Sequence, residues 1–180
     1  MVINTVSHVF ILFVICAYFI FRITRAQIAL KSLDTEMRTE GNVHDIHFEA
    51  IEKSIGTSEA YWRIRAKNSM SQGCCDKAMA YIQNARLYSS APELLGLEAE
   101  CLRLTGHTDA GMQLVDTLSN MLPHVLRLKL ILMRYNASCE EREEALRYAA
   151  DIISTGAKYD TGEARAIIQE AKKYKQIYEK

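Results

Sequence analysis

Residues 62–78, WRIRAKNSMSQGCCDKA, have a counterpart 33 residues later in residues 95–111, LGLEAECLRLTGHTDAG. In each stretch a large apolar residue comes first, an alanine follows four residues later, a glycine eleven residues later, and a small residue ends the stretch. These positions hold Trp62, Ala66, Gly73 and Ala78 in the first stretch and Leu95, Ala99, Gly106 and Gly111 in the second. A large side chain fills the space between paired helices, small residues permit close crossing, and glycine supplies a tight turn. The pattern therefore predicts repeated pairs of helices.

A weaker copy of the pattern precedes these two stretches. Gly41 lies 32 residues before Gly73, and Leu30 takes the position of the large residue. Ile46 stands where a small residue is expected, and Ser58 stands where a proline is expected. We therefore count a degenerate first repeat upstream of Trp62.

A fourth copy follows Pro123, which, like Pro92 in the preceding repeat, separates one helix pair from the next. Residues 124–135 and 143–154 both have the apolar spacing of helices, and the acidic run from Glu140 to Glu144 replaces the turn glycine. A last helix is predicted from Gly162 to Tyr178, with one polar face. It is expected to cap the repeats.

The offsets resemble those of the tetratricopeptide repeat, a helix pair of about 34 residues that carries Trp, Gly, Ala and Pro in this order. The resemblance implies an all-α fold, a tetratricopeptide-like α-α solenoid of about three to four helix pairs with a C-terminal capping helix. We expect a repeat domain over residues 26–160 and the capping helix over residues 161–180.

A closer resemblance covers residues 81–180. The segment NMLPHVLRLKLILM (120–133), the Ala-x-x-Ile-Ile helix end at 149–153, Gly156–Lys158 and Glu163–Lys172 are similar to the C-terminal repeat tail of O-antigen ligase and polymerase-like membrane proteins of Bacteroidetes. In that family the tail follows a last membrane helix, and the chemistry belongs to a membrane core of many helices. No catalytic residue of that core is matched in this sequence.

An apolar segment at the N-terminus predicts a membrane anchor over residues 1–25. Every residue from Val9 to Phe21 is apolar or aromatic, and with the flanking residues 2–23 the run reaches the roughly 20 residues needed to cross a bilayer. A cleavable signal peptide would have basic residues before the run, whereas here Arg22 and Arg25 follow it. The positive-inside rule then places the repeats in the cytoplasm, as part of a single-pass protein of the inner membrane. The alternative is a buried core helix.

Composition favours neither nucleic-acid binding nor a disulfide framework. The 22 basic and 22 acidic side chains cancel, so no overall field draws the chain to nucleic acid. The 5 cysteines are odd in number, and Cys74 and Cys75 are adjacent. They are expected to be free thiols.

Motifs for chemistry are few. The sequence has no phosphate-binding glycine loop, no His-Glu-x-x-His and no Cys-x-x-Cys. His44 and His47, with Asp45 and Glu49 nearby, have the spacing of a helical metal site, but surface polarity explains them equally well. We expect no enzymatic activity, no cofactor and no bound metal.

The repeat register places a set of basic residues on the first helix of each pair, facing the concave groove of a solenoid. They are Lys31 and Arg38 in the first copy, Arg63 and Lys67 in the second, Arg103 (beside Glu100) in the third, and Arg127 and Arg134 in the fourth. Such a groove would suit a carboxylate, a phosphate or an acidic peptide. The alternative is a merely solvated helical face.

Two functions follow from these features. The first is a membrane-anchored scaffold that recruits a protein partner through an acidic or extended segment. The second is an accessory subunit or derivative of a cell-surface glycan system related to O-antigen ligases, whose anchor packs beside a polytopic membrane protein. The span has few small residues, only Cys16 and Ala17 within its interior, which favours a simple tether over tight helix packing.

Overall fold

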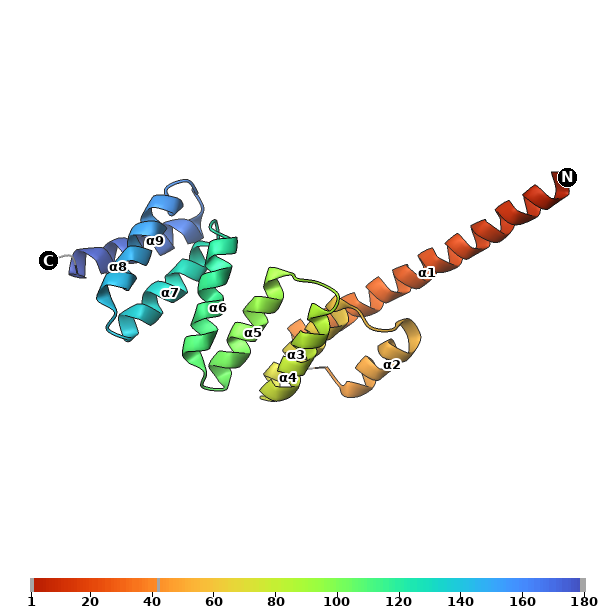
Figure 1. The fold of residues 1–180 in the computed structure, drawn as a ribbon, viewed down its shortest axis with the longest axis horizontal. Coiled ribbons are helices and arrows are strands. Elements are labelled where there is room, and N and C mark those ends of the chain that lie inside the picture. Colours follow the sequence, from red (N-terminus) through yellow and green to blue (C-terminus); the bar gives the residue numbers. More distant parts are fainter. Residues whose placement is uncertain (1, 42, 179–180) are drawn as a thin grey trace. The chain divides into compact units, whose positions relative to one another are not determined.

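The computed structural model describes the backbone of residues 2–41 and 43–178, and within these all side chains except those of residues 2–11, 54 and 55. All regular secondary structure in this part of the chain is helical (Figure 1). The helices are α1 (Val2–Glu40), α2 (Asp45–Ile55), α3 (Glu59–Ser71), α4 (Cys75–Arg86), α5 (Pro92–Leu104), α6 (Thr108–Met121), α7 (Leu126–Ser138), α8 (Arg142–Gly156) and α9 (Gly162–Tyr178). The prediction of an all-α fold is confirmed, and α9 has the predicted bounds.

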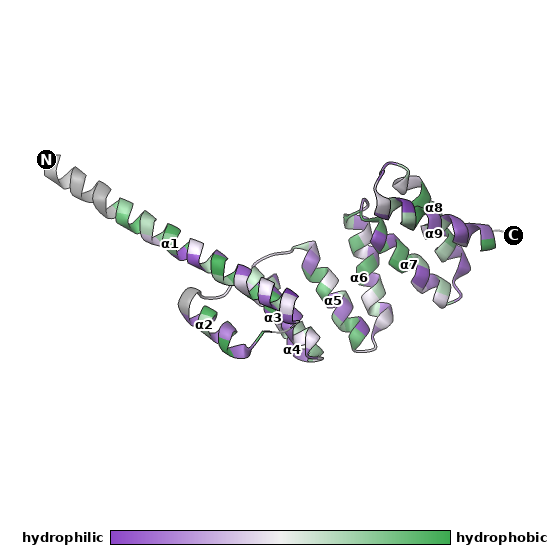
Figure 2. Ribbon diagram, turned by 180° about the vertical axis from the view of Figure 1, so that it is seen from behind, coloured by the Kyte–Doolittle hydropathy of each residue, from purple (hydrophilic) through white to green (hydrophobic). Residues whose placement is uncertain are grey.

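Helix α1 is one uninterrupted helix of 39 residues. It contains neither proline nor glycine, so nothing in its sequence breaks the hydrogen-bond ladder between the apolar segment and the residues that follow. Its part from Leu12 onward is long and apolar enough to cross a membrane. Apolar residues surround the first described turns, and polar residues appear only beyond them (Figure 2). Of the predicted embedded segment, residues 2–23, the side chains of residues 2–11 lie outside the described set.

The chain divides into two compact units, Met1–Ser89 and Ser90–Lys180. In the first, α3 packs against α4, and α1 contacts α2 and α3. One cluster of its core contains Leu33 from α1, Val43 from the turn, Phe48 from α2, and Tyr61 and Ile64 from α3. The unit boundary falls inside the segment that the sequence assigned to one repeat domain, at the polar residues that precede Pro92.

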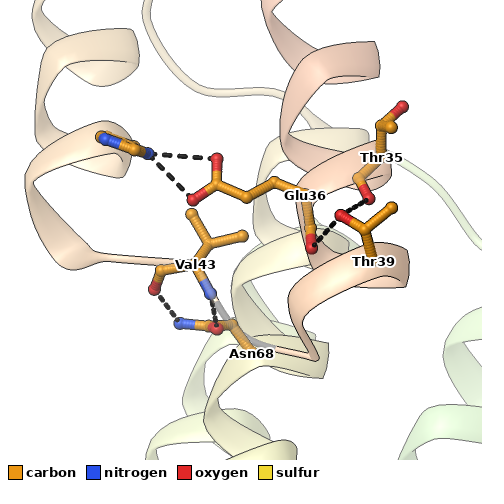
Figure 3. Close-up of polar contacts among 6 residues, drawn as sticks. Thr35, Glu36, Thr39, Val43 and Asn68 are labelled. Carbon is orange, nitrogen blue, oxygen red and sulfur yellow. Dashed lines mark hydrogen bonds and ion pairs between the residues drawn. The ribbon is translucent and has the colours of Figure 1, made fainter.

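The Asn68 side chain links the turn between α1 and α2 to α3 through two hydrogen bonds. Its side chain is 2% exposed; Oδ1 accepts a hydrogen bond of 2.7 Å from the Val43 backbone N–H, and Nδ2 donates one of 3.0 Å to the Val43 carbonyl (Figure 3). Because a buried amide and the backbone groups beside it all need partners, this reciprocal pair fixes the turn. It thereby holds α1 in the first unit.

In the second unit α5 packs against α6, α6 against α7, α7 against α8, and α9 against both α8 and α7. Buried residues from these helices form one cluster, which includes Val115, Leu130, Met133, Ile152 and Ile167. Helix α9 buries Ala164, Ile167 and Ala171 on its inner face. The face that the sequence marked as apolar is thus the one that packs.

The turns inside three helix pairs have the same geometry. Gly73 and Gly106 have φ of 74° and 85°, and Glu140, at the equivalent place between α7 and α8, has φ of 64°. The backbone N–H after each of these residues bonds to the carbonyl five residues earlier: Cys74 to Ser69 at 2.8 Å, His107 to Leu102 at 2.8 Å, and Glu141 to Asn136 at 2.9 Å. Glu140 therefore occupies the left-handed conformation that the other pairs assign to glycine.

Because a non-glycine residue is strained in the left-handed region, Glu140→Gly is expected to stabilise the protein by about 1 kcal/mol. The reverse type of change, Gly106→Val, places a β-branched residue at positive φ and is expected to destabilise it by roughly 2 kcal/mol. A Cβ at Gly106 meets no atom within 4 Å, so this cost comes from the backbone alone. Urea titration followed by circular dichroism measures both changes. If both variants changed the free energy of unfolding in the same direction, the equivalence of the turns would be wrong.

Candidate functional site

The seven basic residues predicted to line a groove all lie on the first helix of a pair. In the first unit, Lys31 and Arg38 lie on α1, and Arg63 and Lys67 lie on α3, which packs against α1. In the second unit, Arg103 lies on α5, and Arg127 and Arg134 lie on α7. The two sets belong to different units, and their union in one groove stays a prediction.

Four of the seven arginine or lysine side chains are paired with carboxylates. On their own helices, Arg38 Nε lies 2.9 Å from Asp34, Arg63 Nε lies 3.0 Å from Glu59 without hydrogen-bond geometry, and an Arg103 terminal nitrogen lies 2.6 Å from Glu100. These acids stand three or four residues before their arginines, so helix periodicity could have revealed the pairs. They reduce the positive charge that the predicted groove presents.

Arg134 has a partner from another helix. Its Nε and a terminal nitrogen donate hydrogen bonds of 2.7 and 2.8 Å to the two carboxylate oxygens of Glu170 on α9. The hydrogen bonds hold the pKa of Glu170 below its ordinary value. Arg134 therefore helps to fasten the last helix, a role that sequence spacing could not show because the two residues are 36 positions apart.

The other three basic residues of the predicted groove are Lys31, Lys67 and Arg127. No ion pair links Lys31, Lys67 or Arg127 to a carboxylate in the described part of the chain. Lys31 and Arg127 are exposed and Lys67 is half-buried. These three side chains remain available for an external anion.

Arg127 stands beside a small apolar pocket of about 260 Å³ at the beginnings of α7 and α9. Its lining includes the buried side chains of Leu126, Ala164 and Ile167, and Glu163 also contributes. A guanidinium next to an apolar floor can receive a carboxylate-bearing segment that also offers an apolar side chain. The sequence predicted Arg127 but not the pocket.

A second, polar pocket of about 230 Å³ lies among α6, α7 and α8. Lys129 is 6% exposed there, with Nζ 2.5 Å from Asp151 and 3.4 Å from the Thr155 hydroxyl. Lys129 stands eleven residues before Glu140, the position that Trp62 holds relative to its turn glycine. A buried lysine needs such a partner, so the Asp151 carboxylate accounts for it as part of the packing between α7 and α8.

Nearby, Tyr148 donates a hydrogen bond of 2.7 Å to Asp116. Burial, followed by this hydrogen bond, raises the pKa of Tyr148 to about 12. Asp116 also lines a wider hollow of about 650 Å³ along α6 and α7, whose charged residues are Asp109, Asp116 and Glu141. This hollow is acidic, unlike the surroundings of Arg127, and the sequence did not single it out.

Trp62 lies between paired helices, as the register predicted, but it is only half-buried. Its ring stacks on Tyr81 of α4 with centroids 5.6 Å apart, whereas its neighbour Tyr61 is fully buried. Arg65 donates a hydrogen bond of 2.8 Å to the Tyr61 hydroxyl, which itself donates one of 2.8 Å to Glu52. Burial and the bond to Glu52 raise the pKa of Tyr61 to about 12. This cluster joins α2, α3 and α4, and within it the buried Arg65 Nε has no hydrogen-bond partner.

His47 of α2 contacts a carboxylate of α1, and His44 is the N-cap residue of α2. His47 Nδ1 lies 3.1 Å from both carboxylate oxygens of Glu36 on α1, and the rings of His44 and His47 are 6.2 Å apart. In the described residues no three side chains of His, Cys, Asp or Glu come together as ligands. His47 thus contributes to the contact between α1 and α2.

Comparison of the chain with protein-family models, with curated proteins and with solved structures gives no match. The resemblances to tetratricopeptide repeats and to the tails of O-antigen ligase-like proteins therefore stay predictions.

Proposed function

We propose that this chain is a membrane-tethered, tetratricopeptide-like interaction module that holds a protein partner at the cytoplasmic face of the inner membrane. The observation that carries the proposal is the continuity of α1. One helix contains both the apolar segment and the residues Leu33 and Met37, which pack in the first unit. The apolar segment and the helical unit are therefore one rigid piece rather than two parts joined by a flexible linker.

The exposure of the apolar segment supports insertion into a membrane. From Leu12 to Phe21 every side chain is exposed, and Phe13 is 70% exposed. A core helix of the same composition would be covered by the rest of the fold, whereas nothing in the described part of the chain covers this one. Lipid is the environment that removes such a surface from water, and a length of about 20 residues matches the bilayer core.

The helix pairs support a repeat architecture. The three turns at Gly73, Gly106 and Glu140 have matching geometry. Five residues after each of them, Ala78, Gly111 and Ala145 are buried where the second helix crosses the first. Tetratricopeptide-like pairs use the exposed side of their first helices to bind extended segments, and here that side carries the basic residues.

The basic side chains without a carboxylate partner indicate what kind of ligand we propose. In the first unit Lys31 and Lys67 offer two positive charges, and in the second unit Arg127 offers one, beside the apolar floor of its pocket. We propose an acidic, extended protein segment with at least one apolar side chain as the ligand, and no catalysis, cofactor or metal.

Charge reversal tests the proposal. Lys67→Glu with Arg127→Glu is expected to weaken partner capture about tenfold or more, which corresponds to roughly 1.4 kcal/mol, while leaving the melting temperature nearly unchanged. Capture is measured by affinity purification of the full chain from detergent-solubilised membranes, with mass spectrometry of what is retained. Wild-type capture should also fall as salt rises from about 0.1 M to about 1 M, because the Debye length shortens from about 10 Å to about 3 Å.

The matched control is Lys77→Glu with Lys172→Glu. Both lysines are exposed, on α4 and α9, and the change in net charge is the same. Equal capture by the charge-reversed and control proteins would exclude the proposed site. A polytopic membrane enzyme among the proteins lost would identify the module as an accessory subunit of that enzyme, and a soluble protein would identify it as a recruiting scaffold.

A further inference from the structure

The topology of the first unit determines which of its ends lies nearest the proposed membrane span. Helix α1 leaves the span and turns at Gly41, and α2 then runs back along α1, with His47 beside Glu36 (Figure 1). Helix α3 runs outward again, so that Asn68 near its end contacts Val43 in the α1–α2 turn. Helix α4 returns. The α2–α3 loop and the C-terminal end of α4 therefore lie on the side of the unit that faces the span.

A side-chain contact confirms that these two segments meet. The Thr57 hydroxyl in the α2–α3 loop lies 2.8 Å from the Tyr88 hydroxyl, just after α4. Leu30 of α1 packs against the core of the unit. From Arg25, at the edge of the span, to Leu30 there are five residues, or about 8 Å of helix. The span-facing end of the unit is thus within reach of the lipid headgroup layer.

This end carries exposed apolar side chains. Leu87 is 82% exposed, Tyr88 is 55% exposed, and Ile28, two residues before Leu30 on α1, is 64% exposed. Leu87 has the largest exposed fraction of any large apolar residue in the described part of the chain. Tyrosine has an apolar ring and a polar hydroxyl, which suits it to the interface between hydrocarbon and water.

The charges at this end fit an anionic lipid surface. Arg22 and Arg25 follow the apolar run on α1, and Arg86 immediately precedes Leu87. The Arg25 guanidinium lies over the Phe21 ring at 5.6 Å, an arrangement that keeps the cation beside the last residue of the run. Basic residues near the cytoplasmic leaflet are attracted by its anionic lipids.

We propose that Leu87, Tyr88 and Ile28 form a second membrane contact, in which the span-facing end of the first unit inserts into the headgroup layer of the bilayer that α1 crosses. The inference rests on the proposed function, because the bilayer is placed by α1. Two points of attachment would hold the unit upright on the membrane and fix the direction in which Lys31 and Lys67 face. The occupant of this apolar surface is lipid rather than a second protein.

Fluorescence quenching in vesicles tests the contact. Three versions of the full chain each carry one cysteine, and the other native cysteines are replaced. The single cysteine is Cys16, Ser90→Cys beside the proposed contact, or Ile46→Cys, and it is labelled with an environment-sensitive fluorophore. Ile46 is 69% exposed at the beginning of α2, toward the opposite end of the unit. The proteins are inserted into vesicles of phosphatidylcholine with phosphatidylglycerol, some of which carry spin-labelled lipids.

We expect the spin-labelled lipids to quench the labels at residues 16 and 90 and to leave the label at residue 46 nearly unquenched. Adding Leu87→Glu should reduce quenching at residue 90 at least twofold without changing it at residue 16. Quenching at residue 16 with none at residue 90 would overturn the second contact and leave the anchor intact. Unquenched label at residue 16 would overturn the anchor and the second contact together. Quenching at residue 90 that is insensitive to Leu87→Glu would overturn the role of Leu87.

Discussion

Replacing Phe48 with alanine should destabilise the first unit by about 3–5 kcal/mol. Phe48 is fully buried and packs in one cluster with Leu33 of α1 and Tyr61 of α3, with its ring edge-to-face with Tyr61 at 5.9 Å. Its removal leaves a cavity where three helices meet, and it also removes the ring beneath the Arg65 guanidinium, 5.6 Å away. The loss therefore combines hydrophobic transfer, cavity formation and a cation–π contact.

The measurement uses Trp62, the only tryptophan in the sequence, which lies in this unit. Its fluorescence during urea unfolding in detergent reports the stability of the unit directly. Ile46→Ala on the same helix is the control; that side chain is 69% exposed, and the change should stay within about 0.5 kcal/mol. Similar midpoints for the two variants would show that α2 is not packed as described.

Gly111→Val should destabilise the second unit by about 3 kcal/mol. A Cβ at Gly111 would lie 2.8 Å from the backbone carbonyl oxygen of Ala99, a separation that the α5–α6 pair can relieve only by moving apart. Valine adds two further methyl groups at the same crossing. The larger side chain therefore separates the helices and opens the packing around Ala99 and Val115.

Gly96→Ala supplies the matched comparison, because Gly96 is also inside a helix but a Cβ there would meet only the Leu118 side chain at 3.8 Å. Alanine favours the helix over glycine, so this variant should gain about 0.5–1 kcal/mol. Circular dichroism during urea unfolding measures both. If Gly111→Val were as stable as wild type, the close crossing of α5 and α6 would be wrong.

Much of the local structure follows from short-range chemistry and was predictable. Glycine at residues 73 and 106 marks turns because only glycine adopts positive φ without strain, and α1 continues to Glu40 because no residue in it breaks a helix. Pro92 begins α5 at the place where its missing N–H costs nothing. Helix existence and pairing therefore depend on residues that lie close together in the sequence.

The long-range features were not predictable in the same way. The bonds from Arg134 to Glu170 depend on how α9 lies against α7, which no periodicity within either helix specifies. Lys129 is a charged residue in a buried position, and only the proximity of the Asp151 carboxylate explains its burial. Likewise the greater burial of Tyr61 than of Trp62 reflects which side of α3 meets α1 and α2. Of these features, the bonds from Arg134 to Glu170 pair one of the predicted cations with a carboxylate from a distant part of the sequence.

In the proposed topology α1 spans the inner membrane and the helices beyond the span lie in the cytoplasm, and thiol accessibility tests this topology most directly. Cys139 is exposed at the end of α7, and in a Cys74→Ser, Cys75→Ser background it is the exposed thiol outside the proposed span. The protein should stay with the membranes after alkaline carbonate extraction. Cys139 should resist a charged, membrane-impermeant maleimide in intact cells and react once the cells are opened. Extraction into the soluble fraction would contradict the span, and labelling of Cys139 in intact cells would contradict the proposed cytoplasmic location of the helices that follow it.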